Sequence, residues 1–122
     1  MKKKKEEPEV YRNFIEDLGI NCWDNSCPSG WEELVTRLIE DLNTLGWDGE
    51  LHQVKEKFGT LRFYIGSGTD EIFKRIDQAE SESAKVCQTC GKAAKSRTYN
   101  GYWVATLCMG CHKKYKNRKS QN

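Results

Sequence analysis

Two cysteine pairs constrain the fold of this 122-residue chain more than any other feature. Two residues separate Cys87 from Cys90 and Cys108 from Cys111, and seventeen residues lie between the pairs. A two-residue gap lets both thiolates of a pair reach one ion, and a hairpin between the pairs can complete a tetrahedron. The spacing therefore predicts one structural Zn²⁺ on these four cysteines. Redox-active or simply buried thiols are the alternative.

The residues around the pairs favour a treble clef. Gly91 is expected at the turn of the first knuckle, and Asn100-Gly101 is a favoured two-residue hairpin turn followed by a strand-like segment at 102–104. The second pair is expected to open a C-terminal helix, whose amides would stabilise thiolate charge near Cys111. Four protein ligands leave no open position for an activated water, so the predicted metal folds the module and does not catalyse.

Cys108 to His112 also satisfies the C-x-x-C-H pattern of covalent haem attachment. Haem would require export, and the N-terminal lysines are not followed by the apolar segment of a signal peptide. It would also leave Cys87 and Cys90 without a role, so zinc is the preferred interpretation. His112 is interpreted as a solvated helix residue, with replacement of one cysteine ligand as the alternative.

The remaining cysteines, Cys22 and Cys27, have C-x4-C spacing without a matching second pair. We interpret them as thiols packed beside Trp23 and Trp31. A second metal site that borrows His52 or His112, a disulfide and an intermolecular contact are alternatives, and the sequence leaves the role of these two cysteines open.

Helical periodicity dominates the first part of the chain. A short helix is expected over residues 8–18, and residues 20–31 are interpreted as a turn-rich connector. Residues 29–32 resemble a capping box at the start of a longer helix that ends before Gly46. Its apolar stripe consists of Trp31, Leu34, Val35, Leu38, Ile39, Leu42 and Leu45.

A β-hairpin and a further helix follow. Residues 50–58 and 61–66 flank Gly59-Thr60, which is the expected turn, and Val54 and Phe58 are expected on one face. Thr69 is expected to cap a helix that ends near Ala84. The residues of this helix that are expected to face inward are Ile72, Phe73, Ile76 and Ala79.

Together these elements predict an α+β fold, a small helix and β-hairpin body with a C-terminal treble-clef or zinc-ribbon module. We assign residues 1–7 to a disordered basic N-terminus, 8–84 to the body and 85–122 to the zinc-binding module with its basic tail. No apolar run approaches the roughly 18 residues of a membrane span, so no membrane contact is expected. Because the N-terminal lysines are not followed by the apolar segment of a signal peptide, a reducing cytoplasm is the expected compartment. Cysteines there are expected to be thiols or metal ligands.

Charge is divided unevenly along the chain. Residues 84–122 hold nine Lys or Arg and no Asp or Glu, whereas residues 1–83 hold eleven basic and eighteen acidic residues, a balance of −7. A basic module attracts polyanions through phosphate contacts, and interleaved aromatic rings can stack on bases. The candidate residues for nucleic acid or a partner are Arg97, Tyr99, Tyr102, Lys113, Lys114, Lys116, Arg118 and Lys119. A solubilising tail, with aromatic rings that only cover the zinc core, is the alternative.

Motifs for catalysis are missing from the sequence. His52 and His112 are its only histidines, and it contains no phosphate-binding GxxxxGK[ST] loop and no HExxH. HNH-type nucleases can share treble-clef geometry, but they need several histidines. Residues 85–122 contain only His112. We therefore predict that the protein is not an enzyme.

Two resemblances extend these predictions. The segment VKEKFGTLRFYIGSGTDEI, with GW before it and AESES, CxxCG and W-x-x-TLCxxC after it, resembles a family of small uncharacterised phage and prophage proteins over residues 27–111. This resemblance implies a phage context. Residues 87–118 are similar to GATA-type fingers, but Ser96 to Tyr99 replace the Trp-Arg-Arg element of those fingers, so base-specific reading of the major groove is not expected.

The predicted function is that of a non-enzymatic, zinc-binding phage accessory protein that acts by stoichiometric binding. It would inhibit or modulate a nucleic-acid-processing or defence complex in the host bacterial cytoplasm, as anti-CRISPR proteins do. A zinc-finger DNA- or RNA-binding protein, such as a transcriptional regulator, is the alternative. The sequence does not fix the target or the oligomeric state.

Overall fold

The computed structural model describes residues 15, 18, 20 and 22–120 of the chain. Its elements are β1 (Cys22–Asn25), the 3-10 helix η3 (Ser29–Trp31), α2 (Glu32–Thr44), β2 (Leu51–Lys57), β3 (Thr60–Ile65), α3 (Asp70–Ser83), β4 (Lys95–Tyr99), β5 (Trp103–Leu107) and α4 (Met109–Ser120). The predicted mixed α+β class is confirmed. The predicted N-terminal tail and most of the predicted helix over 8–18 lie outside the described residues, although Ile15 is helical and fully buried.

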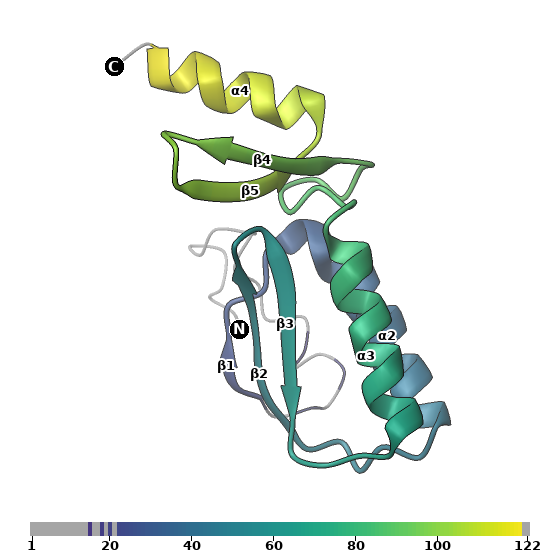
Figure 1. The fold of residues 1–122 in the computed structure, drawn as a ribbon. Coiled ribbons are helices and arrows are strands. Elements are labelled where there is room, and N and C mark those ends of the chain that lie inside the picture. Colours follow the sequence, from purple (N-terminus) through teal and green to yellow (C-terminus); the bar gives the residue numbers. More distant parts are fainter. Residues whose placement is uncertain (1–14, 16–17, 19, 21, 121–122) are drawn as a thin grey trace, which may run out of the picture.

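The body has two layers, in which α2 and α3 lie side by side and cover one face of a three-stranded sheet (Figure 1). The β4–β5 hairpin and α4 stand at one end of this body, with the hairpin between α4 and the body. Six of the seven residues in the predicted apolar stripe are buried, because a 3.6-residue period keeps them on the face of the helix toward the sheet. The exception is Leu45, which is 36% exposed beyond the end of α2.

The sheet contains a strand that the sequence did not predict. Residues 22–25 lie in the supposed connector, yet they form β1, which pairs in parallel with β2 and places Cys22 opposite Leu51. A strand of four residues is too short to show a recognisable alternation of apolar and polar side chains. Its backbone hydrogen bonds are made to β2, which is distant in the sequence.

The predicted capping box is also wrong. Residues 29–31 form η3, and α2 begins at Glu32 without a side-chain cap on its first turn. The Ser29 hydroxyl instead donates to the carbonyl oxygen of Thr89, 3.5 Å away. Tertiary contact with the C-terminal module therefore replaces the local capping interaction.

The β2–β3 hairpin turns one residue earlier than expected. Phe58 and Gly59 both have positive φ, of 56° and 81°, and Lys57 pairs with Thr60 across this two-residue turn. Phe58 is 65% exposed, so the prediction that it shares a buried face with Val54 is wrong. The turn imposes left-handed backbone on Phe58 and rotates its side chain away from the core.

Helix α3 follows its predicted bounds closely. The Thr69 side chain accepts a hydrogen bond from the amide of Ile72 at 3.3 Å, which confirms the predicted cap. Ile72, Ile76 and Ala79 are buried, but Phe73 is 45% exposed and was wrongly placed in the core. Among the described residues, none of the helices has the length and apolar character that a bilayer crossing requires.

Replacing Ser83 with alanine is expected to destabilise the body by about 1–3 kcal/mol. The fully buried Ser83 hydroxyl accepts from the amide of Leu61 at 2.8 Å and donates to the carbonyl of Glu80 at 2.6 Å. Ser83→Ala leaves the buried Leu61 amide without its acceptor. Urea denaturation measures the loss, and Ser81→Ala, at an exposed position of the same helix, serves as the control. Equal midpoints for the two variants would contradict this role.

Candidate metal centre

The first cysteine pair lies in a tight turn just after α3. The amide of Gly91 donates to the carbonyl of Cys87 at 2.9 Å, and the amide of Cys87 donates to the carbonyl of Lys92 at 2.8 Å. Gly91 has a φ of 87°, which glycine adopts without strain and which confirms its predicted place in the turn. These bonds fold residues 87–92 into a knuckle that presents two sulfur atoms to one side.

The second pair joins β5 to α4. Cys108 directly precedes α4, and the amide of His112 donates to its carbonyl oxygen at 2.8 Å. The amide of Cys111 donates to the Cys108 sulfur at 3.4 Å. The second knuckle therefore opens the C-terminal helix as predicted, and the first turn of that helix directs an amide at a thiolate.

The four sulfur atoms converge on one point. All of them lie within 4.8 Å of one another, and the Cys90 and Cys108 sulfurs are 3.5 Å apart. Metal–sulfur bonds of about 2.3 Å in a tetrahedron separate neighbouring sulfurs by about 3.8 Å, whereas a disulfide bond measures about 2.05 Å. No disulfide bond joins any of the six cysteines. The residues present therefore fit one metal ion with four thiolate ligands.

Burial and hydrogen bonds make the four thiols unequal. Cys87 is fully buried and Cys108 is 9% exposed, whereas Cys90 lies at the surface. The Cys111 amide, with neighbouring thiols, lowers the pKa of Cys108 to about 6. Burial, followed by the adjacent thiols, raises the pKa of Cys111 to about 12. Four thiolates so close together repel one another, so a full set of charged ligands needs a cation between them.

His112 does not belong to this cluster. It is half-buried, and its Nδ1 lies 2.7 Å from the hydroxyl of Tyr99. Burial lowers the pKa of His112, and the charges of Arg97 and Lys116 lower it further. His112 is therefore only partly exposed to solvent, whereas the sequence predicted a solvated helix residue. The haem alternative needs Cys108 and Cys111 for thioether bonds, whereas both sulfurs lie in the four-sulfur cluster.

Cys22 and Cys27 lie in the body, outside the metal centre. Cys27 is buried within the same core cluster as Trp31, and Cys22 packs against that cluster. Burial raises the pKa of Cys27 to about 12, so its thiol stays protonated. Among the described residues, the only group of three or more candidate ligands is the four-cysteine cluster, and His52 instead contacts Glu50 at 3.1 Å. The side chain of Trp23 lies outside the described part.

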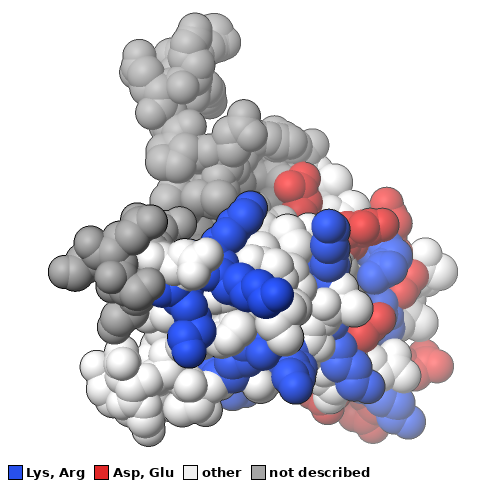
Figure 2. Space-filling view, turned by 90° about the horizontal axis from the view of Figure 1, so that it is seen from above, with Lys and Arg blue, Asp and Glu red and all other residues white. Residues whose placement is uncertain are grey.

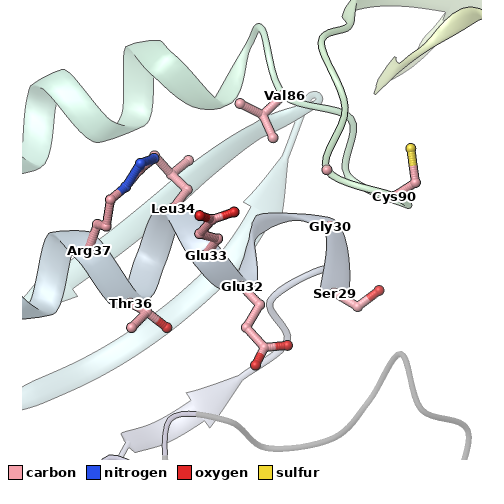
Figure 3. A pocket seen from close by; sticks show the side chains of 10 residues that line it. Ser29, Gly30, Glu32, Glu33, Leu34, Thr36, Arg37, Val86 and Cys90 are labelled. Carbon is pink, nitrogen blue, oxygen red and sulfur yellow. The ribbon is translucent and has the colours of Figure 1, made fainter.

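Hydrogen bonds attach the first knuckle to the body. The Trp31 indole donates to the carbonyl of Val86 at 2.8 Å, and the amide of Gly30 donates to the carbonyl of Gln88 at 3.0 Å. A groove of about 540 Å³ lies beside this junction. Figure 3 shows the side chains of Glu33 and Arg37 on α2 and that of Cys90 on the knuckle around it. This junction was not predicted from the sequence, although the glycine at position 30 is a local feature that bears on it.

A second junction lies at the tip of the β2–β3 hairpin. The hydroxyl of Thr106 is fully buried and donates to the carbonyl of Gly59 at 2.6 Å. A methyl group on Gly59 would lie 3.2 Å from Val104 and 3.3 Å from the Thr106 hydroxyl. Val104 and Thr106 on one face of β5 therefore pack on the body. The alternating residues Trp103, Ala105 and Leu107 lie on the opposite face, toward α4.

The predicted binding residues divide into exposed and internal groups. Lys113, Lys114 and Lys116 are exposed on α4, and Tyr102 is 78% exposed in the β4–β5 loop. Figure 2 looks down on the module, where Lys and Arg side chains gather on the nearer surface while Asp and Glu side chains lie toward one side. The side chains of Arg118 and Lys119 lie outside the described part.

Tyr99 and Arg97 have mainly internal contacts. Tyr99 is 8% exposed, with its ring centroid 4.8 Å from that of Tyr115 and 5.2 Å from that of Trp103. The ring therefore completes the small core of the module and leaves little surface for the predicted contact with nucleic acid or a partner. Arg97 is half-buried, and its Nε donates to the carbonyl of Leu107 at 2.9 Å.

Comparison with protein-family models, with curated proteins and with solved structures finds no match to this chain. The resemblances to phage proteins and to GATA-type fingers stay predictions. Function is therefore inferred from the geometry and charge of the chain itself.

Proposed function

We propose that Cys87, Cys90, Cys108 and Cys111 hold one structural Zn²⁺ and that the protein acts by stoichiometric binding without catalysis. The observation that carries this proposal is the convergence of four sulfur atoms within 4.8 Å. Thiolates are the donors of structural zinc sites, and four of them fill a tetrahedral shell. When bound, zinc supplies four metal–sulfur bonds that stabilise the module, and no position stays open for a reacting water.

The binding surface that we propose is the basic face of the module, formed by Lys113, Lys114 and Lys116 of α4 and by Tyr102 at the adjacent loop. These side chains are exposed, and residues 84–122 contain no acidic residue. A zinc ion with four thiolates adds about −2, which leaves the module near +7. Such a surface favours a polyanionic partner.

The target that we propose is a nucleic-acid-processing or defence complex of a bacterial host. The resemblance to phage proteins motivates this choice, together with the opposite charges of the body and the module. The alternative is direct binding to DNA or RNA, which would suit a regulator of transcription. Exposed aromatic rings among the lysines favour it, because Trp103 is 41% exposed and Tyr102 is 78% exposed.

Mobility shifts with nucleic acid over a salt series test the basic face. For Lys113→Gln/Lys116→Gln, we expect the slope of log Kobs against log[salt] to fall in magnitude by about 1.4–1.8, because two phosphate contacts are lost. Lys57→Gln/Lys74→Gln removes the same charge from exposed positions of the body and should leave the slope unchanged. An equal loss in both variants would mean that α4 is not the binding face.

Affinity purification from bacterial lysate separates the two candidate targets. Recovery of one defined protein complex after nuclease treatment would favour the host complex. Tight binding to isolated nucleic acid at physiological salt, without any recovered protein complex, would favour the alternative. Zinc content measured in the same preparation should be one ion per chain.

A further inference from the structure

A groove of about 290 Å³ lies between β5, α4 and the first knuckle. Strand β5 contributes alternate residues to one wall, because residues two apart share a face of a strand. Helix α4 contributes residues 111, 114 and 115 to the other wall, at the spacing that shares a helical face. The rim and floor include Gln88, Trp103, Leu107, Lys114 and Tyr115.

The aromatic part of this groove is held in a fixed orientation. The ring centroids of Trp103 and Tyr115 are 5.4 Å apart at an interplanar angle of 53°. Both rings also contact Tyr99, which is buried beneath them and fixed by its hydrogen bond to His112. Trp103 nevertheless remains 41% exposed, so part of a rigid aromatic surface faces the solvent.

Two of the polar side chains that line the groove, Gln88 and Lys114, offer hydrogen-bond donors. The side-chain oxygen of Gln88 accepts from the amide of Thr106 at 2.9 Å. Because a backbone amide can only donate, this contact fixes which end of the Gln88 carboxamide is oxygen, and the nitrogen end carries two donor hydrogens. Lys114 adds an ammonium group at an exposed position. The groove therefore suits a flat ring with acceptor atoms that carries a nearby negative charge.

We propose that this groove receives one unpaired base of a single-stranded nucleic acid. The base stacks on Trp103, and Lys114 contacts a flanking phosphate. This inference deepens the role of the basic face and rests on its direct binding to nucleic acid, the alternative given under the proposed function. A duplex keeps its bases paired and stacked on one another, so it offers the groove phosphate but no free base.

The test compares three labelled probes by fluorescence anisotropy at one salt concentration. They are a 12-nucleotide single strand of mixed sequence, an abasic strand of the same length, and the strand annealed to its complement. The abasic strand retains the phosphates and lacks the bases. We expect the base-containing strand to bind about 5- to 150-fold more tightly than the abasic strand, the range for one base stacked on an aromatic ring.

Matched variants assign this difference to the groove. Trp103→Leu should abolish the preference for the base-containing strand, whereas Tyr102→Leu, at an exposed aromatic position that does not line the groove, should retain it. Lys114→Gln should weaken binding to the single strand more than Lys113→Gln, which removes the same charge from the neighbouring exposed position. Zinc content and the thermal melt of each variant show that it is folded.

The outcomes separate this inference from the proposed function. Equal affinity for the base-containing and abasic strands, with salt-dependent binding to both, would overturn the base-binding groove and leave the basic face intact. Equal effects of Trp103→Leu and Tyr102→Leu, in folded proteins, would also overturn it. Binding to none of the three probes would overturn both the groove and direct nucleic-acid binding. A folded Trp103→Leu protein that lacks only the base-dependent part of the affinity supports the inference.

Discussion

Removing the metal is expected to unfold the C-terminal module and to destabilise the body with it. Among the described residues, five form the buried core of the module, and two of them, Cys87 and Cys108, are proposed ligands themselves. A core of this size cannot offset the entropy of ordering the chain, so we expect metal–sulfur bonds at the proposed site to provide most of the folding free energy of the module. Metal binding contributes about 10–16 kcal/mol in small zinc domains, which equals or exceeds the stability of a typical whole domain.

Loss of the metal should change the environment of Trp31 in the body. Its ring is fully buried, and its indole nitrogen donates to the carbonyl of Val86, one residue before the first ligand. When the knuckle unfolds, the indole loses its acceptor and part of its cover. We expect a chelator to lower the melting temperature. In the Trp103→Leu variant, which lacks the tryptophan of the module, it should also shift the tryptophan emission to longer wavelength, and Cys87→Ser or Cys108→Ser should reproduce both changes.

Cys22→Ser is the control for these variants. This thiol is half-buried in β1, outside the four-sulfur cluster, so the protein should keep one metal ion per chain and its sensitivity to the chelator. Melting and circular dichroism that do not change on chelation would show that the metal is dispensable for the fold. Unchanged emission in the Trp103→Leu variant, with loss of helix from α4 alone, would show that the body and the module fold independently.

Patterns that depend on near neighbours in the chain predicted the four-cysteine cluster well. The two-residue gaps within each pair, the Asn100-Gly101 turn and the position of Gly91 are local features, and the backbone geometry follows from them. The hairpin loop is one residue longer than predicted, because Tyr102 stays in the turn and β5 begins at Trp103. The apolar stripe of α2 was equally visible, since helical period and burial coincide there.

Features set by contacts between distant residues were not predictable from the sequence. Strand β1 exists because β2 pairs with it, and Tyr99 is buried because Trp103, Tyr115 and His112 enclose it. Phe73 matched the inward pattern of α3, yet it lies at the margin of the helix face and remains half-exposed. Helical periodicity predicts the direction of a side chain only to within about 100°, the angle between consecutive residues. It therefore cannot decide whether a residue at the edge of a buried face is buried or exposed.

A methyl group at position 30 is expected to have the second-largest effect, because the body and the first knuckle are in backbone contact there. A Cβ on Gly30 would lie 2.2 Å from the carbonyl oxygen of Cys87 and 2.6 Å from the carbonyl carbon of Gln88. Neither atom can move without displacing the knuckle. The displacement would also break the hydrogen bonds from the Gly30 amide and from the Trp31 indole.

Gly30→Ala should therefore lose more than about 3 kcal/mol of unfolding free energy, the sum of an overpacked contact and lost buried hydrogen bonds. Its affinity for zinc, measured by competition with a colorimetric chelator, should fall as well, since one ligand pair shifts relative to the other. Gly110→Ala is the matched control. It lies in α4, where the nearest atom to an added Cβ is the Cys108 sulfur at 4.0 Å, so it should gain up to about 1 kcal/mol. A Gly30→Ala protein as stable as the wild type would show that the knuckle can move away from the body without cost.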